Sequence, residues 1–130
     1  MTLSTLRVSL WIAVAVNLTG TYLFLVPGSA AGQLAGLPWD VPLLYRAMVA
    51  MFIFLLAGMY AWLARQERVV KPMVAAGAIG KASAFIVVFA LWQAGEASGR
   101  AAFTMIADLL LAAAWLAWLI ADGRASRPAR

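Results

Sequence analysis

The sequence predicts an all-α membrane protein, an up-down bundle of four transmembrane helices with both termini in the cytoplasm. Two observations predict this class. Of the 130 residues, 65% are hydrophobic and only 12% are charged, whereas soluble domains are roughly half apolar and a quarter charged. The apolar residues also gather in runs of about twenty, which is the length that crosses a hydrocarbon core of roughly 30 Å at 1.5 Å per residue.

The spans are expected at residues 6–26, 43–64, 72–93 and 101–121, within a single transmembrane domain of residues 1–130. The first run is longer than the core of about 7 to 15 residues in a signal peptide, so we interpret it as a span. Residues 27–42 form a loop outside the membrane, whose middle, residues 30–37, can form a short interfacial helix ending at Pro38. Residues 122–130 form a basic tail, and Gly123 is a candidate cap for the last helix.

The distribution of basic residues predicts the orientation. Cytoplasmic ends of membrane spans are enriched in Lys and Arg. One side of the expected bundle carries only Arg100 and Arg46, and the other carries Arg7, Arg65, Arg68, Lys71, Arg124, Arg127 and Arg130. The second side is therefore the expected cytoplasmic side. Short turns after the second and third spans predict that consecutive helices pack as antiparallel neighbours.

Each span contributes one residue that is especially costly to place in its apolar surroundings: Asn17, Arg46, Lys81 and Asp108. An ammonium at the bilayer centre costs roughly 2.5–3.5 kcal/mol on insertion scales, so Lys81 should face protein. Counted by helix rise from the outer end, Arg46 lies about 5 Å deep, Asp108 about 10 Å, Asn17 about 14 Å and Lys81 about 18 Å. We therefore expect a cluster of Arg46, Asp108 and Lys81.

This cluster has two cations and one anion. Glu96 in the outer turn, a deprotonated lysine or an acidic ligand could offset the excess positive charge. Small residues four apart should let a partner helix approach Lys81 closely: Ala76, Gly80 and Ala84. The alternative is that the polar residues only fix helix register, that Arg46 extends to the interface, and that Asn17 makes a helix-packing hydrogen bond.

The composition excludes several kinds of chemistry. The chain has no cysteine and no histidine, which excludes disulfides, thiolate nucleophiles and the usual zinc ligands. We expect no cofactor, no metal and no nucleic-acid partner. A Glu96–Asp108 pair or an activated Lys81 is conceivable as catalytic chemistry, but no motif supports an enzyme.

Six short runs spread over nearly the whole chain form a recognisable set: Leu10-Trp11-Ile12, Gly36-Leu37-Pro38, Tyr45-Arg46-Ala47, Tyr60-Ala61-Trp62-Leu63-Ala64, Ile79-Gly80-Lys81 and Ala107-Asp108-Leu109. In these runs, and in helix count and length, the sequence resembles small bacterial four-helix membrane proteins grouped with the DoxX-like and BphX-like families. The resemblance implies a compact bundle in the bacterial inner membrane, sometimes a companion to an enzyme complex. It implies no catalytic residue.

Two functions remain open from the sequence. The first is a non-catalytic accessory or scaffold protein that contacts the lipid bilayer and a partner membrane protein or a second copy of itself. The alternative is binding or transport of a lipid, a small amphiphile or an anion in an outward-opening polar cleft, with Arg46, Lys81, Asp108, Asn17 and Glu96 as candidate residues. A small multidrug exporter is disfavoured, because the first span lacks an embedded carboxylate and the charge bias is strong.

Overall fold

A computed structural model describes residues 2–125 of the chain as helices joined by short loops. The helices are α1 (Leu3–Leu25), α2 (Ala30–Leu34), α3 (Leu43–Arg65), α4 (Lys71–Gln93), α5 (Gly99–Thr104) and α6 (Ile106–Ala125). Within these described residues, α1, α3, α4 and the α5–α6 unit are long and apolar enough to cross a membrane, which confirms the predicted helical membrane class. Arg127 and Arg130 of the predicted basic tail lie outside the described residues.

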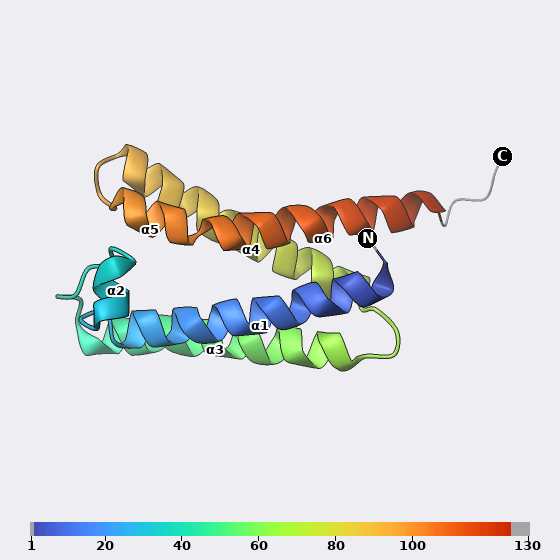
Figure 1. The fold of residues 1–130 in the computed structure, drawn as a ribbon, viewed down its shortest axis with the longest axis horizontal. Coiled ribbons are helices and arrows are strands. Elements are labelled where there is room, and N and C mark those ends of the chain that lie inside the picture. Colours follow the sequence, from blue (N-terminus) through green and yellow to red (C-terminus); the bar gives the residue numbers. More distant parts are fainter. Residues whose placement is uncertain (1, 126–130) are drawn as a thin grey trace.

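The long helices run alternately up and down the long axis of the molecule (Figure 1). We call the end where α1 begins and α6 finishes the terminal end, and the end that carries α2 and the α4–α5 turn the loop end. Helix α1 packs along α3, and α4 packs along α6. The molecule therefore consists of two helix pairs rather than one evenly packed bundle.

The expectation that α3 and α4 would pack as antiparallel neighbours is wrong. They diverge from their connecting loop, and contacts between the pairs come mainly from α1 against α6 (Figure 1). The rings of Tyr60 on α3 and Trp115 on α6 fill the space between the pairs, with centroids 5.1 Å apart in an edge-to-face arrangement. These large side chains hold the backbones of the two pairs apart.

The buried core lies in the half of the molecule next to the terminal end. Leu6, Leu10 and Val74 are completely or almost completely buried around the Tyr60–Trp115 contact. The indole Nε1 of Trp115 donates a hydrogen bond of 2.8 Å to the hydroxyl of Ser9, which satisfies a polar group that burial would otherwise leave unpaired. This bond joins α6 directly to α1.

Charged side chains link neighbouring elements at the terminal end. The guanidinium of Arg7 donates to the backbone oxygens of Gln66, at 2.8 Å, and of Glu67, at 3.2 Å. Arg7 therefore ties α1 to the loop after α3 and satisfies carbonyls at the end of that helix, a position that favours a cation. Lys71 and Asp122 form an ion pair of 2.5 Å between α4 and α6.

At the loop end, a hydrogen bond between Ser98 and Gly36 joins the two halves. Ser98 donates a hydrogen bond of 3.0 Å from its hydroxyl to the backbone oxygen of Gly36, and the same hydroxyl caps α5 by accepting from Ala101 N. Gly36 has a φ of 73°, a conformation that glycine adopts without strain. This turn ends the interfacial helix at Leu34, earlier than the expected boundary at Pro38.

Two further details differ from the sequence predictions. The expected fourth span is interrupted at Met105, between α5 and α6, while Gly123 lies inside α6 rather than capping it.

Tyr60 and Trp118 are buried, with exposed fractions of 1% and 7%. Helix α3 packs its small residues inward, since Ala50, Ala57 and Ala64 are buried.

We predict that Gly77→Ala destabilises the protein and that Gly80→Ala, one turn further along α4, does not. A Cβ at Gly77 would lie 2.9 Å from Tyr60 Cε1 and 3.1 Å from Trp115 Cζ3, whereas a Cβ at Gly80 meets no atom within 4 Å. Overpacking of this kind typically costs about 1–3 kcal/mol. The check is the free energy of unfolding of both variants in mixed detergent micelles. Equal stability of the two variants would contradict the close packing at Gly77.

Candidate functional site

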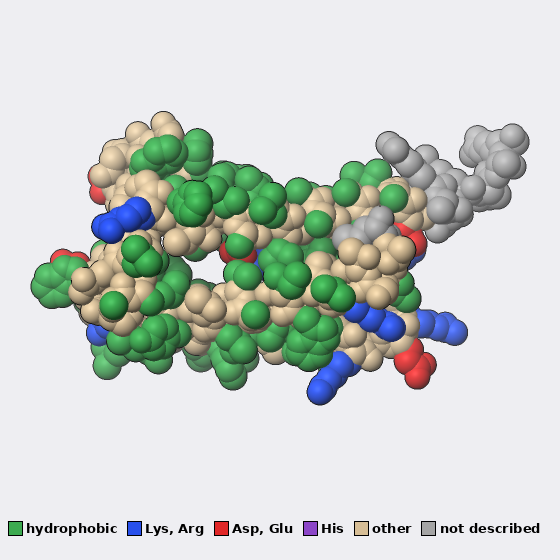
Figure 2. Space-filling model, in the orientation of Figure 1, with side chains coloured by type: hydrophobic (Ala, Val, Ile, Leu, Met, Phe, Trp, Pro, Cys, Tyr) green, Lys and Arg blue, Asp and Glu red, His purple; other side chains and the backbone are tan. Residues whose placement is uncertain are grey.

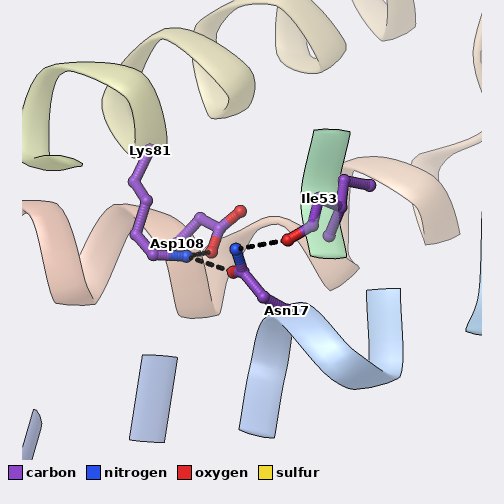
Figure 3. A network of polar contacts seen from close by, with 4 residues as sticks. All are labelled: Asn17, Ile53, Lys81 and Asp108. Atoms are coloured by element: carbon purple, nitrogen blue, oxygen red, sulfur yellow. Dashed lines mark hydrogen bonds and ion pairs between the residues drawn. The ribbon is translucent and has the colours of Figure 1, made fainter. Parts of the chain in front are cut away.

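A buried lysine forms the centre of the polar site. Lys81 on α4 is 4% exposed, and its ammonium makes an ion pair with Oδ1 of Asp108 on α6 (Figure 3). It also donates a hydrogen bond of 3.0 Å to Oδ1 of Asn17 on α1. The sequence-based expectation that a carboxylate on a neighbouring helix would neutralise this lysine agrees with the geometry. Burial of the cation is tolerated because its charge is paired and it donates two hydrogen bonds.

Asn17 connects the lysine to the other helix pair. While its side-chain oxygen accepts from Lys81, its Nδ2 donates to the backbone oxygen of Ile53 on α3 at 3.3 Å (Figure 3). An amide suits this position because it carries an acceptor and a donor side by side. The network formed by Asn17, Ile53, Lys81 and Asp108 thus includes all four membrane-spanning segments.

Tyr60 is a member of the site that sequence reasoning missed. The ammonium of Lys81 lies 5.4 Å from the centre of the Tyr60 ring, on α3, within the range of a cation–π contact. An aromatic residue near the end of a span is typical of interfacial belts, so the position of Tyr60 in the sequence does not indicate a role in the site. The glycine-rich stretch of α4 opposite it was the available signal, because Gly77 makes room for the ring.

Asp108 offers one carboxylate oxygen to the interior space. Oδ2 receives no hydrogen bond from any residue that the structure describes, and the side chain is 18% exposed (Figure 3). Asp108 lies in the first turn of α6, directly after the interruption at Met105. A negative charge is favourable there, because the first turn of a helix carries partial positive charge. The site therefore contains one accessible acceptor beside a neutralised lysine.

A large cavity lies between the two helix pairs, on the loop-end side of the network. Its volume is about 1170 Å³, somewhat above the range of roughly 300–1,000 Å³ that is usual for small-molecule sites. Apolar side chains from both pairs form most of its wall, including Leu23, Ile53 and Val87. Lys81 and Asp108 also line it, so the polar network forms its floor.

The cavity opens sideways. In the space-filling view, which looks across the helix axes, a passage runs between the upper and lower helix pairs, and acidic and basic side chains show at its edge (Figure 2). At the loop end, the contact between Ser98 and Gly36 bridges the two halves above the cavity. In a bilayer, an opening in this direction faces the hydrocarbon core.

Arg46 and Glu96 lie away from this network. Arg46, in the first turns of α3, donates to the backbone oxygen of Leu25 at 3.3 Å instead of contacting Asp108. Glu96 is exposed in the α4–α5 turn. The structure therefore brings together Asn17, Lys81 and Asp108 but corrects the expected inclusion of Arg46. Arg46 lies near the start of α3, and its side chain turns toward the end of α1 rather than toward Asp108.

The charge of the network follows from this correction. Without Arg46, one ammonium faces one carboxylate, so the pair is formally neutral. The excess positive charge that would have required Glu96, a deprotonated lysine or an acidic ligand does not arise. The floor of the cavity is suited to hydrogen bonding rather than to holding a net charge.

The small residues of α4 have a different role from the expected one. Ala76, Gly80 and Ala84 are exposed and line the cavity, while Gly77, Ala78 and Lys81 make the close interhelical contacts. The stripe with four-residue spacing is thus one position away from the contact face. It widens the cavity instead of drawing a neighbouring helix of the same chain onto α4.

Comparison of the chain with protein-family models, with curated proteins and with solved structures gives no match. Groups of acidic residues that could hold a metal ion are also absent from the described residues 2–125. The cavity and its polar floor are therefore the features of the chain that bear on its function.

We predict that Asp108→Leu destabilises the protein by roughly 3–5 kcal/mol, because it leaves the Lys81 ammonium buried without a counter-charge. Lys81→Met should cost less, since Asp108 is partly exposed to the cavity. The double variant Lys81→Met, Asp108→Leu should be more stable than Asp108→Leu alone. A double-mutant cycle of unfolding free energies, followed by tryptophan fluorescence, measures this coupling.

The matched control for this cycle is Glu96→Gln, which removes an acid that lies exposed in a turn. Its unfolding free energy should equal that of the unsubstituted protein. Additive effects of the two substitutions, with no recovery in the double variant, would contradict an energetically coupled ion pair.

Proposed function

We propose that the protein binds a neutral lipid-like amphiphile in the cavity between its two helix pairs, and that the ligand enters sideways from the bilayer. The observation that carries this proposal is a cavity of about 1170 Å³ with apolar walls and a polar floor at mid-span. Small-molecule sites are usually mainly apolar and contain a few polar groups.

The depth of the floor supports a ligand that lies within the membrane. Lys81 is about 15 Å from the start of α4 at the terminal end, since it is ten residues along a helix that rises 1.5 Å per residue. This places the polar network near the middle of a hydrocarbon core of roughly 30 Å. The apolar part of such a ligand would therefore lie in the cavity between the polar floor and the loop end, away from water.

The free acceptor in the floor of the cavity favours a ligand that donates a hydrogen bond to it. Asp108 Oδ2 is an acceptor without a bond from the described residues, and the adjacent ion pair has no net charge. A hydroxyl group matches this acceptor, whereas an anion would meet the carboxylate unfavourably. A long-chain alcohol or a monoacylglycerol is the simplest chemical class with these properties.

The accessory function is a second candidate, and one observation favours it. The exposed stripe of Ala76, Gly80 and Ala84 on α4 has the small-residue spacing that lets transmembrane helices approach closely. In this alternative, a helix of a partner membrane protein or of a second copy enters the gap. The resemblance to DoxX-like and BphX-like proteins is compatible with such a companion role and stays a prediction.

Gly80→Leu tests the proposed ligand site. A Cβ at Gly80 has open space around it, so the larger side chain should fill part of the cavity without disturbing the fold. We expect binding of monooleoylglycerol to the purified protein in detergent to fall by about tenfold or more, which corresponds to about 1.4 kcal/mol. Native mass spectrometry of the bound lipid measures this.

Ala90→Leu is the matched control, because Ala90 is exposed on the same helix but is not part of the cavity wall. Undiminished binding to Gly80→Leu would exclude the cavity as the lipid site. If neither form of the protein binds the lipid, and Gly80→Leu instead loses a membrane protein that co-purifies with the unsubstituted chain, the accessory function is the correct one.

We also propose that the terminal end faces the cytoplasm of a bacterial inner membrane, because Arg7, Arg65, Arg68 and Lys71 lie at that end. The chain has no cysteine, so single substitutions report orientation cleanly. A membrane-impermeant maleimide added to intact spheroplasts should label Gln33→Cys at the loop end and leave Ser4→Cys unlabelled. Labelling of Ser4→Cys alone would reverse the orientation.

A further inference from the structure

A second, smaller cavity lies at the loop end, where α1 ends and α3 begins. Its volume is about 120 Å³, and its wall includes Arg46 among apolar residues such as Pro27, Leu37, Val41 and Tyr45. This space is enough for a compact polar group rather than for a whole lipid. We call it the Arg46 pocket.

Arg46 is incompletely bonded in this pocket. One guanidinium nitrogen, Nη1, donates to the backbone oxygen of Leu25 at 3.3 Å. Its Nε is buried and has no hydrogen-bond partner among residues 2–125. A buried donor without a partner costs about 1–3 kcal/mol, and more for a charged group, so the protein alone leaves this arginine unsatisfied.

The charges around the pocket are also unbalanced. Acidic side chains are absent from its wall and from the first turn of α3, and Pro42 provides no side-chain cap for that helix. Asp40, the nearest acid along the chain, is exposed and does not line the pocket. The cation and the start of a 23-residue helix therefore present positive potential to the same space.

We propose that the Arg46 pocket binds a phosphate group, and that its occupant is the phosphodiester of a membrane phospholipid. The guanidinium carries Nε–H and a terminal N–H as a fork that matches two phosphate oxygens, and turning this fork into the pocket would satisfy the unpaired Nε. The pocket lies at the end of the spans, where a bilayer would place its headgroups, and its wall is mainly apolar. This site uses neither Asp108 nor a neutral ligand, so it goes beyond the proposed function.

The test is a titration of the detergent-solubilised protein with dioleoylphosphatidylglycerol, with bound lipid counted by native mass spectrometry. We expect Arg46→Gln to weaken binding by about fivefold or more, the factor that corresponds to about 1 kcal/mol per basic residue at a membrane surface. Arg100→Gln is the matched control, because it removes an exposed cation at the same end outside the pocket. It should leave the affinity unchanged.

Two further measurements make the result decisive. Val41→Phe retains Arg46 but fills the pocket, so it should also weaken binding, including in the case that Arg46→Gln does not fold. Competition with millimolar inorganic phosphate distinguishes the sources: no displacement identifies the lipid phosphodiester, and displacement identifies free phosphate as an occupant of the same site. Equal affinities of the unsubstituted protein, Arg46→Gln and Val41→Phe would overturn the proposal, as would an equal loss in Arg100→Gln.

Discussion

The structure depends on the need to satisfy one ammonium group in the middle of a membrane. Lys81 cannot extend to the water at either end of the bundle, since it is 4% exposed and about ten residues from either end of its helix. Its ammonium forms an ion pair with Asp108, donates a hydrogen bond to Asn17 and makes a cation–π contact with the ring of Tyr60. Each partner comes from a different helix, so the requirements of one side chain fix the relative positions of all the spanning segments.

The same requirement explains why the protein is dense at one end and open at the other. On the terminal side of Lys81, Leu6, Leu10 and Trp115 interlock in a buried core. On the loop side, the helix pairs separate, and the chief link between them is the bond from Ser98 to Gly36. The polar network lies at the boundary, where the packed half ends. The network therefore separates the packed half of the molecule from the cavity.

Much of this architecture could be predicted from the sequence. Hydrophobic length and composition were sufficient for the four spans, and the cost of burying Lys81 correctly predicted a contact with Asp108. These inferences depend on large free-energy costs, of exposing apolar runs to water and of burying an unpaired charge, that few folds avoid. Ala50 and Ala57 repeat at helical spacing in the sequence, and both are buried on the inward face of α3.

The rest of the site depended on tertiary packing that sequence spacing does not determine. Ala76 and Gly77 are adjacent and both small, and only the position of the Tyr60 ring decides that Gly77 forms the contact while Ala76 lines the cavity. Arg46 lies near the start of α3, but its direction is set by the carbonyl of Leu25 at the end of α1. The cavity itself arises because two aromatic rings hold the helix pairs apart, an effect of shape rather than of periodicity.

The interruption at Met105 has a mechanical consequence. Helix α5 is bonded through Ser98 to Gly36 at the loop end, whereas α6 is anchored in the core by Trp115. Membranes differ in thickness by a few ångströms, and a span must adjust to its surroundings by tilting or bending. Because the helix is broken at Met105, a bend at that point would move α5 with the bilayer and leave Asp108, in the first turn of α6, beside Lys81.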